Sequence, residues 1–352
     1  MKIKLKQAFN LQMGKTPARN RPDYWNGENK WISIADIGNT GKFLVKTKES
    51  ITEAGIEGSG IKVVPQGTVI MSFKLSIGKT AITSEDMYTN EAIMAFIDNG
   101  KFAVDTDYLY HLCCGTNWTA GTNKAVMGLI LNKATLLEKE IPLPDINEQH
   151  EIATKLDKID AIIAERQQQL ELIDQLVKSR FIELFGDPVL NQHGWRKVAL
   201  EVNATLPNGR AYKQGELLDS GKYPVLRVGN FFSNRGWYYS DLELDDDKYC
   251  DNGDLLYAWS ASFGPQIWNG GKVIYHYHIW KVLVGEAYNK QFLCKLLEYA
   301  TESLMGDTHG IAMMHLTKSG MEKTEFIVPP IEQQEQFAAF VEQTDKSKYY
   351  SS

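Results

Sequence analysis

The hydrophobic and polar positions of this chain follow two different periods, and the change between them divides the sequence. Short apolar runs bounded by Gly, Asn and Asp fill residues 1–140 and return in residues 195–325; such runs are typical of β-strands. Residues 147–184, between the two regions, contain neither Gly nor Pro and consist mostly of good helix formers. The pattern therefore predicts two strand-rich regions with one long helix between them.

The predicted long helix carries an apolar stripe with the heptad spacing of a coiled coil. Large aliphatic residues recur every seven positions and form one of the two sets of core positions of the heptad. A second aliphatic set occupies the other core positions, where Arg166 and Arg180 interrupt it. Gly186 and Pro188 follow and are expected to end the helix. The predicted seam of this helix consists of Ile152, Leu156, Ile159, Ile163, Leu170, Ile173, Val177 and Leu184.

Much of the chain is present twice. Residues 141–149 return as residues 326–334, with Pro144 matching Pro329 at an offset of 185, and residues 67–78 match residues 253–264 at an offset of 186. Residues 32–37 match residues 226–231 more weakly, at an offset of 194. An ordered series of matches at nearly constant register indicates a duplicated unit, and therefore two similar domains.

The second copy of the repeat also begins a helix. Phe337 aligns with Ile152 and Val341 with Leu156, so we expect both to extend the seam. Because the sequence stops at Ser352, the second helix is expected to be shorter than the first. Two other helices are predicted, a short one around Tyr108–Cys114 and an amphipathic one at 290–304.

Composition and charge narrow the class of protein. The chain has 352 residues and a net charge of −6, which disfavours a free-standing nucleic-acid binder, although cations gather in residues 1–30. No apolar run has the length of a signal peptide or a membrane span, so we expect a cytoplasmic protein. The four cysteines form no CxxC pair and are expected to be reduced thiols.

Motifs for nucleotide or nucleic-acid chemistry are incomplete. The GKT triplets at Gly14–Thr16 and Gly78–Thr80 lack the earlier glycine of a phosphate loop, and Gly78 is better explained as a turn glycine. Residues 22–30 imitate a nuclease motif, but their spacing is tight and the second copy lacks it, so turn residues are favoured. No Asn/Asp-Pro-Pro-aromatic tetrad of an adenine methyltransferase is present.

His276 and His278 alternate with Tyr275 and Tyr277 and would share one face of a strand. Such a pair could bind a metal ion, but no third ligand is evident, so a half-buried strand is favoured and no metal site is predicted. We also find no Ser/His/Asp or Cys/His arrangement. The sequence therefore indicates a binding protein rather than an enzyme, and requires no cofactor.

Basic and aromatic residues interleave in segments that are expected to be loops. Lys and Arg could neutralise phosphates, and Asn, Arg and aromatic side chains could contact bases, although any one of them could also be ordinary solvated surface. The candidate DNA-binding residues are Lys15, Arg19, Arg21, Lys74, Lys79, Lys124, Arg210, Tyr212, Lys213, Arg227, Asn230, Arg235, Trp259 and His309.

The layout resembles the specificity subunit of type I restriction–modification systems over residues 1–345. The segment IPLPDINEQ with its following helix, FGDP at 185–188 and the glycine-turn segment 67–78 carry this resemblance. It implies an α+β fold with two similar strand-rich target-recognition domains, joined by a long coiled-coil helix and followed by a second, shortened C-terminal helix. We place the first recognition domain at 1–146, the central spacer helix at 147–187, the second recognition domain at 188–328 and the second spacer helix at 329–352.

The same resemblance implies a function without catalysis. Each recognition domain would read one half of a split target in double-stranded DNA, with the helices as a ruler between the half-sites. Methyltransferase subunits would dock on this scaffold, a restriction subunit could join them, and the chain alone could self-associate through its spacer helix. A stand-alone DNA-binding regulator or adaptor built from the same domains is the alternative.

Overall fold

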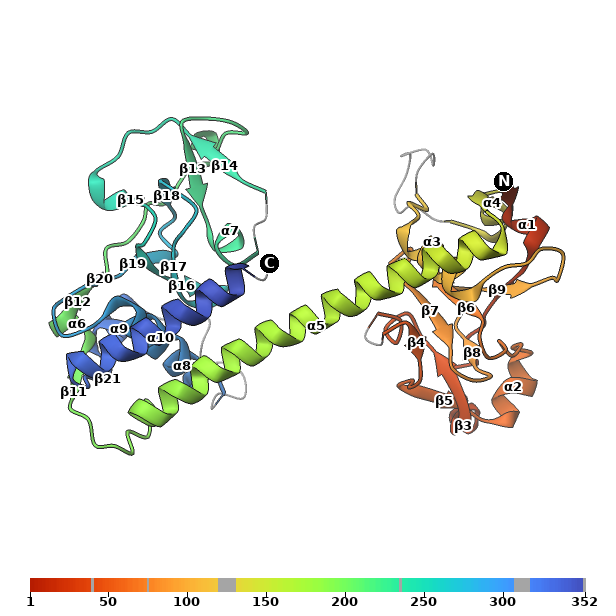
Figure 1. Cartoon of the computed structure of the whole chain (residues 1–352), viewed down its shortest axis with the longest axis horizontal. Helices are drawn as coiled ribbons and strands as arrows, with labels where there is room; N and C mark the ends of the chain where they lie inside the picture. The colour runs from red at the N-terminus through yellow and green to blue at the C-terminus, as the bar shows by residue number, and fades with distance from the viewer. Residues whose placement is uncertain (39–40, 75, 120–130, 234–235, 307–316, 351–352) are drawn as a thin grey trace. The chain divides into compact units, whose positions relative to one another are not determined.

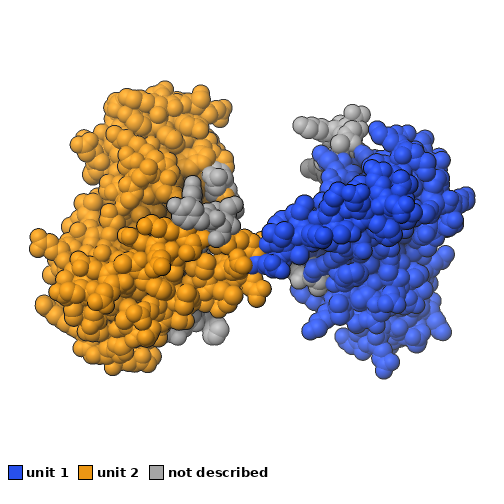
Figure 2. Space-filling model, in the orientation of Figure 1, with its two compact units in different colours: residues 1–165 blue, residues 166–352 orange. Residues whose placement is uncertain are grey.

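The computed structural model describes residues 1–38, 41–74, 76–119, 131–233, 236–306 and 317–350. The chain forms two compact units, residues 1–165 and 166–352, which Figure 2 shows in different colours. Both units combine strands and helices, as expected for the α+β class.

Unit 1 is built around a five-stranded sheet with the order β2-β9-β6-β7-β4 and a three-stranded sheet with the order β5-β3-β8 (Figure 1). A small antiparallel pair of β1 and β10 joins the start of the unit to the segment just before α5. Its elements are β1 (Lys2–Lys4), α1 (Leu5–Ala8), β2 (Phe9–Met13), η1 (Pro22–Tyr24), β3 (Trp25–Ile32), β4 (Phe43–Leu44), β5 (Glu49–Ile51), α2 (Glu53–Ser59), β6 (Val69–Ser72), β7 (Thr80–Thr83), β8 (Tyr88–Thr89), β9 (Ile93–Asp98), α3 (Thr106–Gly115), α4 (Lys133–Leu137) and β10 (Glu140–Pro142).

Unit 2 repeats this plan. A hairpin of β16 and β17 pairs with β19, and a four-stranded sheet has the order β14-β13-β18-β15. Its elements are β11 (Lys197–Ala199), α6 (Leu200–Asn203), β12 (Ala204–Thr205), η2 (Gln214–Glu216), β13 (Tyr223–Leu226), α7 (Val228–Ser233), β14 (Tyr238–Ser240), η3 (Asp246–Lys248), β15 (Tyr249–Cys250), β16 (Leu255–Ser260), β17 (Ser262–Ile267), β18 (Val273–Tyr275), β19 (Ile279–Lys281), β20 (Leu283–Val284), α8 (Lys290–Gly306), α9 (Lys318–Lys323) and β21 (Glu325–Ile327).

A helix begins within each of the repeated segments 141–149 and 326–334. These helices are α5 (Ile146–Phe185, 40 residues) and α10 (Ile331–Tyr350, 20 residues). The division between the compact units falls inside α5, so its first half belongs to unit 1 and its second half to unit 2. Gly186 follows α5 with φ of 76°, a conformation that suits the predicted helix stop.

A buried glutamine anchors the start of each of these helices in the same way. In unit 1, Gln149 accepts a hydrogen bond from the N–H of Asp105 at 2.9 Å and donates to the carbonyls of Ala103 and Pro144 at 3.1 and 3.0 Å. A polar side chain with no exposed surface must satisfy its hydrogen bonds inside the protein, and these three bonds do so.

In unit 2, Gln334 makes the matching set of bonds. It accepts from the N–H of Asn289 at 2.9 Å and donates to the carbonyls of Ala287 and Pro329 at 3.0 and 2.8 Å. The match of Gln149 to Gln334 in the sequence is thus a match of hydrogen bonds, which confirms the duplication at atomic detail.

The central strands of each unit are buried on both faces because a hydrophobic core lies on each side of the sheet, and successive side chains point into one core and then the other. In unit 1, Val69 and Met71 of β6 belong to a core that includes α3 and the start of α5, whereas Ile70 belongs to a second core on the other face. In unit 2, Tyr257 and Leu256 divide in the same way.

The predicted seam is buried at its two ends and exposed between them. Ile152 packs against the first core of unit 1, while Val177 and Leu184 join Phe337 and Val341 in the core of unit 2. Phe181, which the heptad count left outside the seam, is fully buried in that core and contacts Phe185, Phe292 and Phe337. By contrast, Ile159 and Ile163 are 51% and 50% exposed, and Leu156, Leu170 and Ile173 are half-buried.

Two sequence predictions of local structure are wrong. Residues 22–30 were expected to be turn residues, but Pro22–Tyr24 form η1 and Trp25–Ile32 form the strand β3. The run around His276 and His278 is not a continuous strand, because β18 ends at Tyr275 and the chain turns at Tyr277 and His278 before β19 begins at Ile279. The two histidine rings lie 4.6 Å apart at this turn instead of sharing the face of a strand. The β propensity of the run concealed a turn that tertiary contacts impose.

Candidate nucleic-acid interface

Parallel strand pairs place equivalent residues side by side in the two units. In unit 1, β3 and β8 are parallel with Ile32 opposite Thr89, and the N–H of Asn90 donates to the carbonyl of Ile32 at 2.9 Å. The residues that follow these strands, Ser33 and Asn90, are therefore neighbours. We call this position the carboxyl edge of unit 1.

Unit 2 has the same construction with different side chains. The parallel strands β13 and β18 place Leu226 opposite Tyr275, and the N–H of His276 donates to the carbonyl of Leu226 at 2.9 Å. Arg227 and His276 therefore form the carboxyl edge of unit 2, at the positions that Ser33 and Asn90 occupy in unit 1.

A buried side chain shapes the loop behind each carboxyl edge. The carboxylate of Asp36 accepts from the N–H of Ser33 at 2.8 Å, and the amide oxygen of Asn230 accepts from the N–H of Arg227 at 3.3 Å. Asn230 also donates to the carbonyl of Gly236 at 3.1 Å. The weak sequence match at an offset of 194 therefore corresponds to equivalent hydrogen bonds in the two units. The amide of Asn230, a predicted DNA-binding residue, is used to hold this loop.

In each unit, a glycine allows another segment of the chain to lie directly against the carboxyl edge. In unit 1, the N–H groups of Gly14 and Lys15 donate to the carbonyls of Ile93 and Thr89 at 3.3 and 2.9 Å. A Cβ atom on Gly14 would overlap the Thr89 carbonyl. Only glycine therefore fits here, which explains the first GKT triplet without a nucleotide.

In unit 2, Gly209 and Arg210 take the corresponding places, donating to the carbonyls of Ile279 and Tyr275 at 3.2 and 3.0 Å. A Cβ atom on Gly209 would overlap the same Tyr275 carbonyl. Lys15 and Arg210 are thus equivalent positions of the duplicated framework.

Several of the predicted cations of unit 1 are already paired inside the unit. Arg19 forms a two-pronged salt bridge with Glu49 and lies 3.9 Å from the ring centroid of Trp25. Arg21 pairs with Asp23 at 2.6 Å, and this pairing lowers the pKa of the Asp23 carboxyl. These contacts reduce the positive charge that either arginine presents to a ligand.

Lys15 is also engaged, since its ammonium donates to the carbonyls of Ser59 and Gly60 at the end of α2, both at 3.1 Å. Lys74 and Lys79, in the loop between β6 and β7, have no salt bridge among the residues that the structure describes. Of the predicted cations of unit 1 that the structure describes, these two are the most available for a phosphate.

In unit 2, Arg210 is bound to Glu216 by two hydrogen bonds of 3.0 and 2.8 Å. This pairing raises the pKa of Arg210 and lowers that of Glu216. Tyr212 lies beside Arg210, with burial as the main cause of its raised pKa, and Lys213 is exposed.

Trp259 is held in a stack of aromatic rings. Its ring lies 5.7 Å from that of Trp280 at 16°, and Trp280 stacks in turn on Tyr257. The indole N–H of Trp259 donates to the carbonyl of Tyr277 at 2.8 Å, which fixes the turn at the carboxyl edge. Trp259 thus supports the candidate site, and its hydrogen-bond donor is not available to a base.

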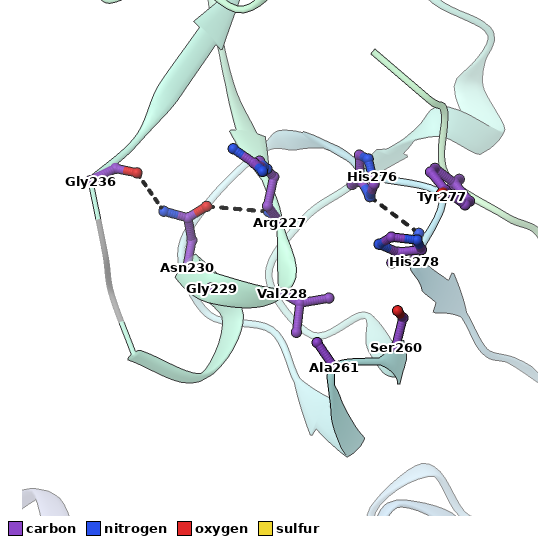
Figure 3. A pocket seen from close by; sticks show the side chains of 10 residues that line it. All are labelled: Arg227, Val228, Gly229, Asn230, Gly236, Ser260, Ala261, His276, Tyr277 and His278. Carbon is purple, nitrogen blue, oxygen red and sulfur yellow. Dashed lines mark hydrogen bonds between the residues drawn. The ribbon is translucent and has the colours of Figure 1, made fainter. Parts of the chain in front are cut away.

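A pocket of about 610 Å³ lies at the carboxyl edge of unit 2. Figure 3 shows Arg227 on one side and His276, Tyr277 and His278 on the other, with Ser260 and Ala261 from the β16–β17 hairpin below them in this view. Ala261 turns the hairpin with φ of 66°, a conformation that is uncommon for an L-residue and costs on the order of 1 kcal/mol.

The sequence suggested the two histidines of this pocket only as metal ligands or strand residues, not as part of a binding site. Burial, followed by the nearby His278 and Arg227, lowers the pKa of His276 to about 4, so this imidazole is neutral at neutral pH. The repeat could have located the histidines in the sequence, because its offset of 186 residues aligns His276 with Asn90 and Ile279 with Ile93.

Three predicted DNA-binding residues, Lys124, Arg235 and His309, lie outside the described residues. Within the described ranges, no group of three or more His, Cys, Asp or Glu side chains is placed to hold a metal ion. A search of the same ranges for a helix of sufficient length and hydropathy to span a membrane finds none.

Comparison with known proteins defines the class. Residues 1–173 and 193–349 match the type I restriction modification DNA specificity domain, one match for each unit of the duplication. The chain belongs to this family. It is a DNA sequence-recognition subunit of a type I restriction–modification system, which works with other subunits of the complex and is itself non-catalytic.

Relatives with known names agree with this assignment. The MjaIX specificity subunit of Methanocaldococcus jannaschii is 24% identical over 364 residues, covering 93% of this chain and 82% of the relative. The EcoR124I/EcoR124II specificity subunit of Escherichia coli is 30% identical over 158 residues, covering 42% of this chain and 38% of the relative.

Two solved structures share the fold. The S subunit of the type I system from M. genitalium has a TM-score of 0.55 at 14% identity, covering 100% of this chain and 90% of that one. A chain from a study of complex assembly and conformational transition of the type I system has a TM-score of 0.52 at 17% identity, covering 99% and 91%. These two structures confirm the predicted fold class, whereas the family match over both units confirms the predicted family and the non-catalytic recognition function.

Proposed function

We propose that each unit reads one half of a two-part DNA target, and that the carboxyl edges of the two units take part in this reading. The observation that carries the proposal is a shared backbone framework with different side chains. Ser33 and Asn90 in unit 1 stand where Arg227 and His276 stand in unit 2, on the same hydrogen bonds. A duplicated scaffold that recognises two different half-sites needs this combination.

Lysines near the carboxyl edge of unit 1 would supply contacts with the DNA backbone. Lys74 and Lys79 lie in the β6–β7 loop, whose counterpart in unit 2 is the β16–β17 hairpin that lines the pocket. Phosphate contacts position a protein on the duplex, whereas groups at base edges select the sequence. The recognition domains would use both kinds of contact.

Exchange of one recognition domain tests the proposal. Residues 1–144 are replaced by the matching segment of another specificity subunit, so that the β1–β10 pair is exchanged as a whole. The hybrid is expressed with its methyltransferase subunits, and the methylated target is mapped by sequencing. We expect one half of the target to change while the other half stays the same. A change in both halves would contradict independent reading.

The spacer helix α5 would carry the partner subunits. In the half of α5 that belongs to unit 1, Ile162 is 65% exposed and lies between the exposed seam residues Ile159 and Ile163. A row of exposed apolar residues on one helix is typical of a protein-binding surface. We propose that methyltransferase subunits cover it in the complex, which a restriction subunit joins, and that a second copy of the chain covers it when methyltransferase is absent.

Sedimentation of the chain alone tests the self-association. Replacement of Ile163 by Asp should reduce association, because the carboxylate would be buried without a partner in an apolar contact. Gln168→Asp is the matched control, since Gln168 is exposed outside the predicted seam. A wild type that sediments as a monomer, or equal behaviour of both variants, would count against this surface.

A further inference from the structure

We propose that the pocket at the carboxyl edge of unit 2 reads a guanine in its half of the target, and that Arg227 is the specificity-determining residue. This inference rests on the DNA-reading function proposed above. It names the chemical group that one recognition domain selects and the side chain that selects it.

Arg227 has the position and the freedom to read a base. It directly follows β13, its backbone N–H is held by Asn230, and its guanidinium lies 5.3 Å from the ring centroid of Tyr238. In the described part of the chain it has no salt bridge, unlike Arg19, Arg21 and Arg210. The side chain is exposed, so its donors remain available to a ligand.

The other walls of the pocket favour a base edge over a phosphate. His276 and His278 face the pocket, but His276 is neutral at neutral pH because burial lowers its pKa. Arg227 is the one lysine or arginine among the lining residues, which also include hydroxyl groups such as that of Ser260. A pocket with a single guanidinium and several uncharged polar groups resembles a specific binding site more than a phosphate clamp.

The geometry of arginine points to guanine. Its planar fork of N–H donors matches two acceptors side by side, and in the major groove guanine presents O6 and N7 in that arrangement. Adenine presents one acceptor and one donor there, and cannot accept both hydrogen bonds. The cation–π contact with Tyr238 restrains the Arg227 side chain, which reduces the entropy lost on binding.

The carboxyl edge of unit 1 has different chemistry, as two different half-sites require. Ser33 is in the place of Arg227 and donates its hydroxyl hydrogen to Asp36 at 2.6 Å. The neighbouring Glu91 accepts from Thr16. Burial would raise the pKa of Glu91, but this hydrogen bond and nearby cations bring it below its usual value, so the group is a carboxylate. Unit 1 therefore has no counterpart of the arginine fork at this position.

The test compares sequence selection by the wild type and by Arg227→Ala and Arg227→Lys. Each full chain, assembled with its methyltransferase subunits, selects bound duplexes from a pool with randomised positions. We expect the wild type to select a two-part motif with a guanine in the unit 2 half. Arg227→Ala should lower the preference for that guanine roughly tenfold or more and leave the other half unchanged. Arg227→Lys should restore it in part, because lysine lacks the planar fork.

A selected duplex with 7-deazaguanine at that position provides a second measurement, since it lacks the N7 acceptor. The wild type should bind it more weakly than the guanine duplex, and Arg227→Ala should bind the two equally. Arg196→Ala, which removes an exposed arginine of the same unit outside the pocket, is the control and should keep the motif.

Two results would overturn the inference while the two-part function stands. One is a wild-type motif that Arg227→Ala leaves unchanged. The other is an equal loss of affinity for all sequences with a smaller salt dependence, which would mean that Arg227 contacts phosphate. A wild type that selects no motif would instead overturn the proposed function itself. Unfolding curves of the variants show whether each retains the native fold.

Discussion

The two units have the same backbone construction at their carboxyl edges and opposite chemistry. In unit 1 the edge carries a serine, an asparagine and a carboxylate, with lysines in the adjoining hairpin loop. Unit 2 carries two histidines, a serine at the hairpin and an arginine that forms no salt bridge with any described residue. Buried groups such as Asp36 and Asn230 hold the loops in both units. The lesson is that a duplicated scaffold can conserve its buried hydrogen bonds while the side chains at its rim diverge.

The largest effect is expected from the glycine that each unit places against a carbonyl. Gly209→Ala should destabilise unit 2 by about 3 kcal/mol or more, because its Cβ would overlap the Tyr275 carbonyl and the backbone would have to move. Gly14→Ala should do the same to unit 1. Denaturant unfolding measures both, with Gly215→Ala as the control, since its Cβ meets open space. If either glycine variant unfolds like that control, the shared framework is not rigid at this contact.

A slightly smaller loss is expected when the buried glutamine of either unit is replaced. Gln149→Leu removes a side chain that satisfies one N–H and two carbonyl groups, and Gln334→Leu removes the same three bonds in unit 2. Each should cost about 2–3 kcal/mol because buried polar groups lose their partners. Similar losses of unfolding free energy would support equivalent roles. If one variant kept the wild-type free energy of unfolding, the equivalent hydrogen bonds would not contribute equally to the stability of the two units.

A pH dependence should separate the two carboxyl edges. Burial, His278 and Arg227 lower the pKa of His276 from 6.5 to about 4, so the unfolded chain binds a proton more readily than the folded one between these values. The contribution of His276 to stability is present above pH 6.5 and is lost as the pH falls toward 4. His276→Asn, which installs the unit 1 residue, should make the unfolding free energy less dependent on pH in this window. Parallel curves for wild type and variant would contradict the assigned environment.

The smallest effect is expected from single lysines near the edge of unit 1. Lys74→Ala or Lys79→Ala should weaken binding to all duplexes alike and reduce the slope of log K against log salt by about one unit. Arg21→Ala should change this slope less, because Asp23 already neutralises Arg21. Binding titrations at several salt concentrations with cognate and scrambled duplexes measure the difference. Equal slopes for all three variants would mean that salt-bridge pairing does not predict which cations reach DNA.

Much of the fold could be predicted because its signals are local. The absence of Gly and Pro from 147–184 predicts α5, and the repeat of residues 141–149 at 326–334 predicts where both helices begin. Local signals failed at the turn of Tyr277 and His278, where aromatic and histidine residues with high β propensity suggested a continuous strand. Hydrogen bonds from distant residues, such as the indole N–H of Trp259, hold that turn.

The candidate site was only partly predictable, because a sequence shows which residues are cationic but not which are paired. Arg19 and Arg227 look alike along the chain, yet Arg19 forms a salt bridge with Glu49, a residue 30 positions away, whereas Arg227 lies over the ring of Tyr238 and has no salt bridge in the described ranges. The sequence by itself determined the duplication, the long helix and the family. Only the tertiary structure decided which side chains gather at each carboxyl edge, because parallel strand pairing joins segments that are about fifty residues apart, such as those of Arg227 and His276.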